Sequence, residues 1–300
     1  MKKCGFVTII GKPNVGKSTL LNALLSKKVS IVTPKAQTTR DDIIGIYSDK
    51  DAQIVFIDTP GMFNGEETLY KTMNRSARRS LSDVDVVCFL IDCSVENYTQ
   101  DEELLANIKT DAPFILVFNK IDLARADMME KIKAHYAELY PNYEQIEISA
   151  LTNFGLKDLK DKIESHLNEG LPFYPEDVYT DKDKSFMAKE IIREELLHFL
   201  KQEIPHECAI LINKFNETDK EIKIKATIVC EKETQKPIII GRGGEMIKKV
   251  SMTARRNLEK MWKKHIILVT EVECLPGWRN DERKLNQLGY GKKAYEGDDF

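Results

Sequence analysis

Short, largely apolar runs recur through the first half of the chain, separated by helix-forming segments. The apolar runs lie at residues 6–10, 54–57, 84–91, 114–118 and 145–148. They show little alternation with polar residues, which is the pattern of parallel strands covered on both faces. Helices are predicted between them, at residues 19–25, 66–81, 101–109 and 126–139. The alternation of strands and helices predicts an α/β domain with a doubly wound, mostly parallel sheet.

The second half has a different pattern. From Ile222 to Cys230 every second residue is apolar, which predicts a half-buried strand paired with the apolar run 209–212. A helix is predicted before these strands, from residue 186, and a long helix after them, ending near residue 264. On the long helix, apolar residues recur every three or four positions, at Ile247, Val250, Ala254, Leu258 and Met261. A last strand at 265–272 completes a smaller α+β domain.

A segment rich in proline and charge separates the two halves. Residues 168–185 contain two prolines and a glycine among many charged side chains, which is typical of a linker. We therefore expect a first domain at 1–170, a linker at 171–185, a second domain at 186–275, and a C-terminal helix and tail at 276–300.

Composition narrows the class of protein. The formal net charge is −3, so any basic surface for a nucleic acid must be local. The six cysteines form no Cys-x-x-Cys pair, and they fit reduced, mostly buried cysteines of a cytosolic protein better than a disulfide framework or a zinc site. Because the first predicted strand begins close to the N-terminus, we expect no signal peptide. The longest apolar runs are too short to span a bilayer.

The strongest motif follows the first predicted strand. Residues 11–18, Gly-Lys-Pro-Asn-Val-Gly-Lys-Ser, match the phosphate-binding loop G-x-x-x-x-G-K-[ST]. Gly11 and Gly16 let the backbone curl around phosphate, where a Cβ would block the approach. Lys17 can then reach the β- and γ-phosphates, and the Ser18 hydroxyl can ligate Mg²⁺. A chance glycine-rich turn is the alternative, but a strand before and a helix after are the context that this loop requires. The motif predicts binding of a nucleoside triphosphate.

A second motif lies at the carboxyl end of the strand 54–57, where ligands bind in parallel sheets. In Asp58-Thr59-Pro60-Gly61, Asp58 can hold Mg²⁺ through water and the Gly61 N–H can sense a γ-phosphate. Alone, these residues could form an ordinary turn. Beside a phosphate-binding loop they indicate a metal and switch element.

A third motif, Asn119-Lys120-Ile121-Asp122, follows the strand 114–118. The Asp122 carboxylate can accept hydrogen bonds from guanine N1–H and the exocyclic amine, whereas adenine would leave this carboxylate unpaired and be rejected. The Lys120 stem can cover the base, and Asn119 can tie neighbouring loops together. Ser149 and Ala150 can offer a backbone N–H to the guanine oxygen, an assignment that rests on their position after the next strand.

Together, and in this order, these motifs resemble those of the P-loop GTPases. The resemblance implies that the GTP-binding residues are Asn14, Val15, Gly16, Lys17, Ser18, Thr19, Asp58, Gly61, Asn119, Lys120, Asp122, Ser149 and Ala150. It also places the first switch at 37–40, where a threonine hydroxyl reaches Mg²⁺ when GTP is bound. We favour Thr39 over Thr38, which gives Ser18, Thr39 and Asp58 (through water) as the Mg²⁺ site. A threonine-rich solvent loop is the competing interpretation.

Met62 stands where Ras-like GTPases carry the glutamine that orients the attacking water. A thioether cannot do this. The chain resembles GTPases with a hydrophobic residue at this position, which hydrolyse GTP slowly or use water placed by other groups, by a K⁺ ion or by a partner. We hypothesise that Asn14 contributes to a K⁺ site. No catalytic residue is assigned; Asn14, Thr39 and Gly61 are candidates for positioning water or charge.

In the second half, a GxxG sequence precedes the long helix. The order helix, strand, strand, helix, GxxG, helix, strand resembles a type II KH domain, whose GxxG loop clamps single-stranded RNA. From Lys236 to His265 there are nine Lys and Arg residues against two Glu residues, which favours a polyanion partner over a merely solvated face. The candidate RNA-binding residues are Gly241, Arg242, Gly243, Gly244, Lys248, Lys249, Arg255 and Arg256.

A P-loop GTPase domain followed by a smaller type II KH domain resembles the Era GTPases over nearly the whole chain. Supporting stretches lie at 35–40, 174–177 and 277–282. The resemblance implies binding of GTP and GDP with Mg²⁺, and binding of the 3′ region of small-subunit ribosomal RNA during assembly of the 30S subunit. It also implies a cytoplasmic protein with peripheral association at the inner membrane; we expect a monomer. One hypothesis is a slow GTPase that times RNA binding, and the other is an RNA-binding assembly scaffold in which GTP turnover is incidental.

Overall fold

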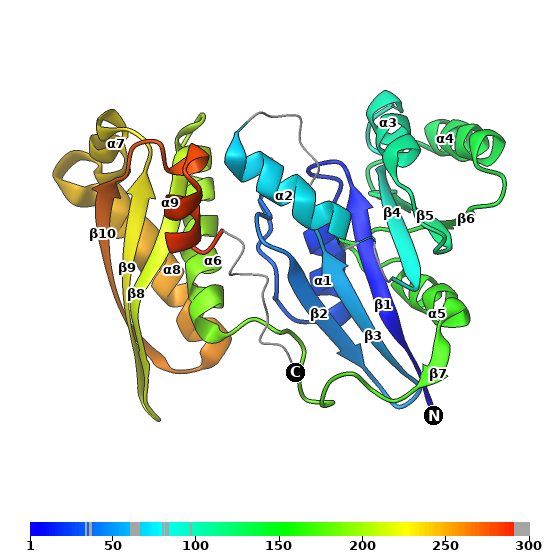
Figure 1. The fold of residues 1–300 in the computed structure, drawn as a ribbon, viewed down its shortest axis with the longest axis horizontal. Helices are drawn as coiled ribbons and strands as arrows, with labels where there is room; N and C mark the ends of the chain where they lie inside the picture. Colours follow the sequence, from blue (N-terminus) through cyan, green and yellow to red (C-terminus); the bar gives the residue numbers. More distant parts are fainter. Residues whose placement is uncertain are drawn as a thin grey trace. The chain divides into compact units, whose positions relative to one another are not determined.

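The computed structural model describes residues 1–33, 35, 38–60, 67–79, 81, 84–96 and 98–290 (Figure 1). Gly61 and Met62, on which the second motif and the expectation of slow hydrolysis depend, lie outside these residues, as does the tail from residue 291. The chain forms two compact units that divide between residues 181 and 182. The beginning of the helix that starts at Thr68 groups with the second unit.

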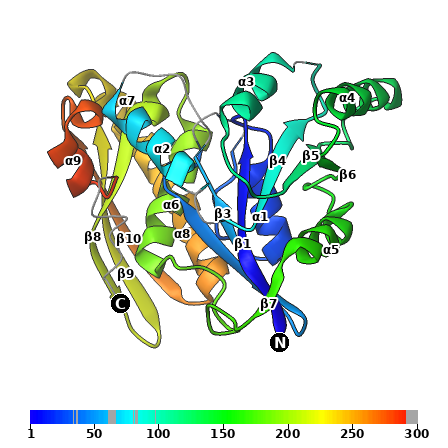
Figure 2. The ribbon, with the colours of Figure 1, turned by 45° about the vertical axis from the view of Figure 1, so that its right-hand side comes forward.

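The first unit contains a sheet with the strand order β2-β3-β1-β4-β5-β6, and β7 pairs with β1 (Figure 2). The strands are β1 Lys2–Gly11, β2 Ile43–Ser48, β3 Ala52–Asp58, β4 Val86–Asp92, β5 Phe114–Asn119, β6 Glu144–Glu147 and β7 Asn168–Gly170. The pairs β1–β3, β1–β4, β4–β5 and β5–β6 are parallel. β2 and β7 run antiparallel to their neighbours. The predicted mostly parallel sheet is therefore confirmed.

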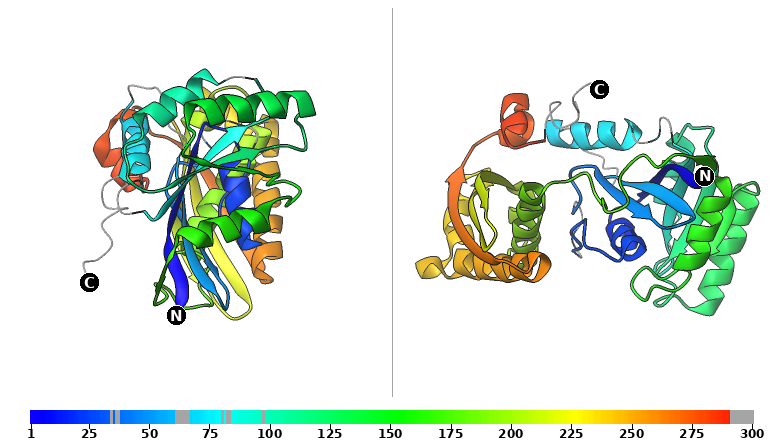
Figure 3. Two further views of the ribbon diagram at one scale, coloured as in Figure 1. Left: turned by 90° about the vertical axis from the view of Figure 1, so that its right-hand side faces the viewer. Right: turned by 90° about the horizontal axis from the view of Figure 1, so that it is seen from below.

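Helices cover both faces of this sheet (Figure 3). They are α1 Lys17–Leu25, α2 Thr68–Arg79, α3 Thr99–Asn107, α4 Ala126–Leu139 and α5 Leu156–His166. The strands β1, β4 and β5 are buried almost throughout. One core cluster joins apolar side chains of β4 and β5 to Leu105 of α3 and to Ile132 and Tyr136 of α4. The rigid sheet holds the loops at the carboxyl ends of its strands in place.

Two elements of this unit have weak sequence signals. β2 contains Gly45, which lowers strand propensity, but a Cβ at Gly45 would come within 2.5 Å of the Leu21 side chain on α1. The glycine therefore permits close packing of α1 on the sheet. α5 is highly charged, and Leu156, Leu159 and Ile163 are its buried residues, a narrow stripe at spacings of three and four.

The second unit has the predicted order of elements. Its helices are α6 Lys184–Phe199, α7 Lys236–Ile240, α8 Glu245–Trp262 and α9 Glu282–Gln287, and its strands are β8 Cys208–Glu217, β9 Glu221–Cys230 and β10 His265–Cys274. β9 is the central strand, antiparallel to β8 and parallel to β10. α6 packs on β8, and α8 packs on β10 and α6. The alternation in β9 places Ile222, Ile224, Ala226, Ile228 and Cys230 in the core.

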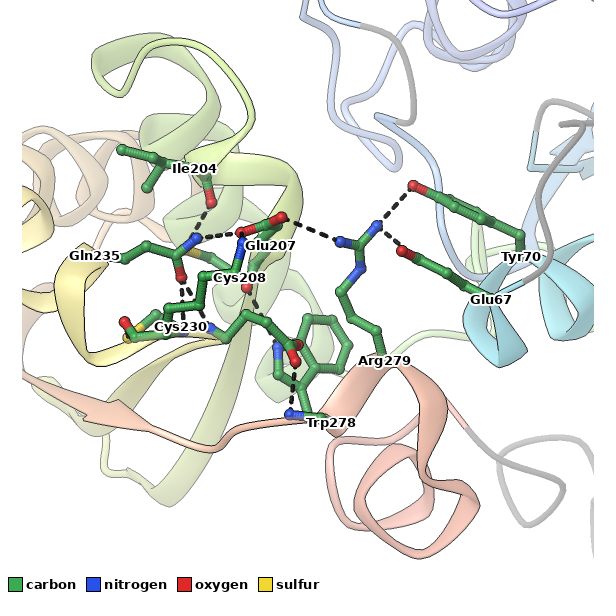
Figure 4. A network of polar contacts seen from close by, with 12 residues as sticks. Glu67, Tyr70, Ile204, Glu207, Cys208, Cys230, Gln235, Trp278 and Arg279 are labelled. Atoms are coloured by element: carbon green, nitrogen blue, oxygen red, sulfur yellow. Dashed lines mark hydrogen bonds and ion pairs between the residues drawn. The ribbon is translucent and has the colours of Figure 1, made fainter.

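A polar network fixes the chain after β10 within the second unit (Figure 4). Trp278 is fully buried, and its indole Nε1 donates to the Glu207 carbonyl at 3.2 Å. Arg279 ion-pairs with Glu67 at 2.5 Å, and its second terminal nitrogen lies 3.5 Å from Glu207. It also donates to the Tyr70 hydroxyl at 2.8 Å. The start of α2 is thereby tied to the segment that follows β10.

All six cysteines are described, and none is in a disulfide; five are buried and Cys274 is half-buried. Burial raises the pKa of the Cys88 and Cys93 thiols to about 12, so both remain protonated at neutral pH. Among the described helices, none combines the length and apolar character needed to cross a bilayer.

Candidate functional site

The phosphate-binding loop connects β1 to α1 as predicted. Its backbone takes left-handed conformations at Asn14 (φ 63°) and Gly16 (φ 106°). A Cβ at Gly16 would lie 2.3 Å from the Asn119 side-chain nitrogen, and a Cβ at Gly11 would lie 2.7 Å from the Leu90 carbonyl. Both glycines are therefore required for the loop to close. Val15 is buried while Asn14 is exposed at the tip.

Lys17, the first residue of α1, is buried and turns back over the loop. Its ammonium donates to the carbonyl oxygens of Gly11 and Lys12, both at 2.8 Å. Burial lowers the pKa of Lys17 to about 8, and the nearby Asp58 charge opposes this shift. A partly desolvated ammonium held at the mouth of a glycine loop gains strongly from an anionic phosphate.

Three predicted Mg²⁺ ligands lie together next to Lys17. The Ser18 hydroxyl donates to Asp58 Oδ2 at 2.7 Å, and the Thr39 hydroxyl lies 2.9 Å from Ser18 Oγ. Thr38, by contrast, donates to the Lys35 carbonyl at 2.7 Å. The structure therefore brings Thr39, and not Thr38, to the cluster. Two hydroxyls and a carboxylate are the hard oxygen ligands that Mg²⁺ prefers.

Asp58 is fully buried, at the end of β3. Burial raises the pKa of this carboxyl, while Lys17, Ser18 and Ser30 oppose the shift. Its Oδ1 atom is buried and accepts no hydrogen bond from any residue that the structure describes. A buried carboxylate oxygen that accepts no hydrogen bond from the protein can accept one from a metal-bound water. The cluster therefore suits the predicted Mg²⁺ ion.

Asn119 ties the loops together as expected. Its Nδ2 donates to the Val15 carbonyl at 2.8 Å, and its Oδ1 accepts from the Ala150 N–H at 3.0 Å. One amide thus joins the phosphate-binding loop to the loop that contains Ser149 and Ala150. Both Ser149 and Ala150 are buried.

Lys120 and Asp122 lie at the rim of this site. Lys120 has a left-handed backbone (φ 65°), and its ammonium ion-pairs with Asp92 Oδ2 at 2.5 Å. Rejection of adenine by an unpaired carboxylate predicts a buried Asp122, but Asp122 is exposed. The side chain of the next residue, Leu123, is also exposed.

One ion pair at this site has no counterpart in any sequence motif. Lys12, in the phosphate-binding loop, lies 2.7 Å from Asp101 Oδ2 on α3, and both side chains are largely buried. Burial raises the pKa of the Asp101 carboxyl to about 6, although Lys12 opposes the shift. The two residues are 89 positions apart in the sequence, so only the fold could reveal the pair.

The GxxG sequence forms a tight turn between α7 and α8 in the second unit. Gly241, Gly243 and Gly244 have φ values of 76°, 60° and 83°. A Cβ at Gly241 would lie 2.7 Å from Met246, whereas Cβ atoms at Gly243 and Gly244 would meet no atom within 4 Å. The last two glycines therefore present open backbone, which a phosphodiester could approach.

Helix α8 continues from this turn with its apolar stripe inside. Val250, Ala254 and Leu258 are fully buried, while the flanking basic residues point outward. Arg242, Lys248, Lys249 and Arg256 are exposed and Arg255 is half-buried. The Lys249 ammonium lies 4.5 Å from the centre of the Phe199 ring. The turn and the helix together offer glycine backbone with cationic side chains next to it.

Comparison with protein families finds two matches in this chain. Residues 6–120 match the family described as 50S ribosome-binding GTPase. Residues 203–279 match the KH domain. The first match contains the phosphate-binding loop and ends within the third motif, and the second contains the GxxG turn.

Curated relatives match over nearly the full length of this chain. The GTPase Era of Clostridium acetobutylicum is 43% identical, covering 97% of this chain and 98% of its own. The GTPase Era of Coxiella burnetii is 42% identical, covering 96% of this chain and 98% of its own.

Two solved structures match both halves of the chain. An Aquifex aeolicus Era variant bound to GDP and AlF₄⁻ has a TM-score of 0.92 and 37% identity, covering 96% of this chain and 99% of that one. Era in complex with MgGDPNP and nucleotides 1506–1542 of 16S ribosomal RNA has a TM-score of 0.93 and 38% identity, covering 97% of this chain and 100% of that one.

Proposed function

Because the chain belongs to the Era family of GTPases, we propose that it is a slow GTPase that binds the 3′ region of small-subunit ribosomal RNA and acts in 30S subunit assembly. The observation that carries the proposal is the joint presence of two sites. The Ser18–Thr39–Asp58 cluster lies beside a phosphate-binding loop in one unit, and an open GxxG turn precedes a basic helix in the other. The solved relative with bound 16S ribosomal RNA supports the choice of RNA.

In the proposed GTP site, backbone N–H groups of residues 14–19 hold the phosphates and Lys17 neutralises them. Asn119 braces the loop, Lys120 covers the base, and Asp122 with the Ser149–Ala150 backbone selects guanine. Gly61 belongs to this set by its motif alone, because it lies outside the described residues.

Ser18, Thr39 and, through water, Asp58 would hold Mg²⁺. The bound ion would supply positive charge to the phosphate oxygens as negative charge develops there. Ser18 and Thr39 would contribute hydroxyl oxygens directly. Asp58 is fixed at the end of β3, so its carboxylate needs little reorganisation to meet a metal-bound water.

Thr39→Ala is expected to weaken binding of a non-hydrolysable GTP analogue about 10-fold, through loss of one oxygen contact. GDP binding should change little, because this threonine is expected to reach the metal in the GTP state. Fluorescence titration with labelled nucleotides measures both affinities. Thr38→Ala is the matched control, since Thr38 bonds to Lys35 and not to the cluster. Equal losses in the two variants would contradict the assignment of Thr39.

Slow hydrolysis follows from Met62, which has no group able to orient water. We propose that Asn14, at the exposed tip of the loop, contributes to a K⁺ site, with Asn14, Thr39 and Gly61 positioning water or charge. Turnover is then expected to rise about 10-fold when K⁺ replaces Na⁺, since one added positive charge near the transferred phosphate is worth at least this much. Rates of phosphate release in the two salts measure this, and equal rates would remove the K⁺ proposal.

For the KH unit, we propose that residues 241–244 clamp the RNA backbone and that Lys248, Lys249, Arg255 and Arg256 neutralise its phosphates. We propose that the protein is a monomer with GDP and GTP as ligands; family resemblance supports a location in the cytoplasm with peripheral association at the inner membrane. Crosslinking in cells, followed by sequencing of the bound RNA, tests the function. Enrichment of the small-subunit rRNA 3′ end is expected, and its absence would overturn the proposal.

The second candidate is an RNA-binding scaffold in which nucleotide binding matters and turnover is incidental. Met62 is the observation that favours it. Cells carrying a variant that binds GTP but cannot hydrolyse it would then assemble 30S subunits normally. A block in assembly would favour the GTP-timed mechanism.

A further inference from the structure

A side chain outside the predicted site reaches the Asp58 carboxylate. Ser30 precedes the first switch and is fully buried. Its hydroxyl donates to Asp58 Oδ2 at 3.1 Å, the same oxygen that accepts from Ser18. Two donors on Oδ2 fix the rotation of the carboxylate, and Oδ1 is the oxygen left without a donor among the described residues.

Ser30 is itself held by Asn22, on the helix that follows the phosphate-binding loop. Asn22 Oδ1 accepts from the N–H groups of Val29 at 2.9 Å and Ser30 at 3.0 Å. Asn22 Nδ2 donates to the Ser30 carbonyl at 2.7 Å. The side-chain amide of Asn22 therefore bonds to both the N–H and the carbonyl of Ser30. We call this pair of hydrogen bonds the clamp.

The residues held by Asn22 belong to a short buried segment that lies between exposed residues. Residues 26–28 are exposed, 29–31 are fully buried, and Val32 is again exposed. The buried segment thus anchors the chain that precedes the first switch to α1, through Asn22, while Thr39 lies further along. Movement of the switch around Thr39 would not disturb the hydrogen bond from Ser30 to Asp58.

We propose that Ser30, clamped by Asn22, is a positioning residue for the Mg²⁺ site. By occupying Asp58 Oδ2 it directs Oδ1 to the water shell of the metal in every nucleotide state. The inference rests on the proposed nucleotide site and adds a residue that acts through Asp58. Partners that orient a metal-binding carboxylate typically change metal affinity by 10–100-fold.

The test is the release of a fluorescent GDP analogue at a series of free Mg²⁺ concentrations. For Ser30→Ala we expect the Mg²⁺ concentration that half-maximally slows release to rise about 10-fold. Release in EDTA should equal that of the unmodified protein, because a purely metal-dependent role disappears without the ion. Ser30→Thr, which keeps the hydroxyl, should restore the normal Mg²⁺ dependence.

Ser165→Ala is the matched control, since Ser165 is exposed on α5 of the same unit and bonds to the Lys162 carbonyl. Asn22→Ala should act in the same direction, and its combination with Ser30→Ala should add little beyond Ser30→Ala alone. An unchanged Mg²⁺ dependence in Ser30→Ala would overturn the proposal, as would equally faster release in EDTA, which indicates a general structural role. Failure of the unmodified protein to bind GDP would instead overturn the proposed function.

Discussion

Asp122→Asn is expected to lower GTP affinity about 1,000-fold or more and to shift preference toward xanthosine triphosphate. A site that pairs a carboxylate with two base donors discriminates by four to five powers of ten against bases lacking them. The asparagine amide presents a donor where guanine also has a donor, whereas xanthine carries an oxygen there and can accept. The change should leave the fold intact, because Asp122 is exposed and Asn119 and Lys120 hold the loop through other contacts.

Competition between labelled GTP and either unlabelled nucleotide measures this preference. Asp127→Asn is the control, since Asp127 is an exposed aspartate on α4 that pairs with Arg125. It should leave both affinities unchanged. An Asp122→Asn variant that kept its preference for GTP would refute the guanine assignment.

Gly243→Asp combined with Gly244→Asp is expected to reduce RNA affinity at least about 100-fold while sparing GTP hydrolysis in the absence of RNA. Two carboxylates placed where the RNA backbone would lie repel phosphate, and the added side chains block its approach to the main chain. No atom lies within 4 Å of either new Cβ, so the fold should accommodate both. The left-handed backbone at residues 243 and 244 strains any non-glycine residue, though aspartate is among the residues that tolerate this conformation best.

The matched control is Gly243→Asn with Gly244→Asn, which imposes the same strain and bulk without charge. Binding of single-stranded RNA with the small-subunit rRNA 3′ sequence measures all variants. We expect the asparagine pair to retain more affinity than the aspartate pair, with the difference shrinking at high salt. If RNA affinity survived the aspartate pair, the KH assignment would be wrong.

The sequence predicted the fold well where one physical signal dominated. β1, β4 and β5 are buried on both faces and therefore read as continuous apolar runs. The first half of β9 has one buried face, with Lys223 and Lys225 exposed, and its sequence therefore alternates; from Ala226 on, both faces are buried. β2 was not predicted, because Gly45 interrupts its apolar sequence. This glycine allows Leu21 and Leu25 of α1 to pack closely on the strand. A glycine of this kind is explained by tertiary contacts and not by the local strand propensity of the sequence.

In the functional site too, some residues could be predicted from local sequence and others depend on tertiary contacts. Residues with a fixed spacing, such as Lys17, Ser18 and Asn119, could be predicted because their motif carries their role. Ser30 and Asp101 could not, since each acts through a partner far away in the chain. An asparagine inside a helix, as at Asn22, is a weak sequence signal for such a partner, because asparagine is a poor helix former and needs a reason to be there.

In the GTP-timed mechanism, the nucleotide bound at the Ser18–Asp58 site controls RNA binding by the GxxG unit. The most direct measurement is the dissociation constant of the RNA 3′-end oligonucleotide with the protein saturated either with a non-hydrolysable GTP analogue or with GDP, both with Mg²⁺. We expect binding to be about 10-fold tighter with the GTP analogue, within the usual range of coupling between two sites. Equal dissociation constants in the two states would contradict it.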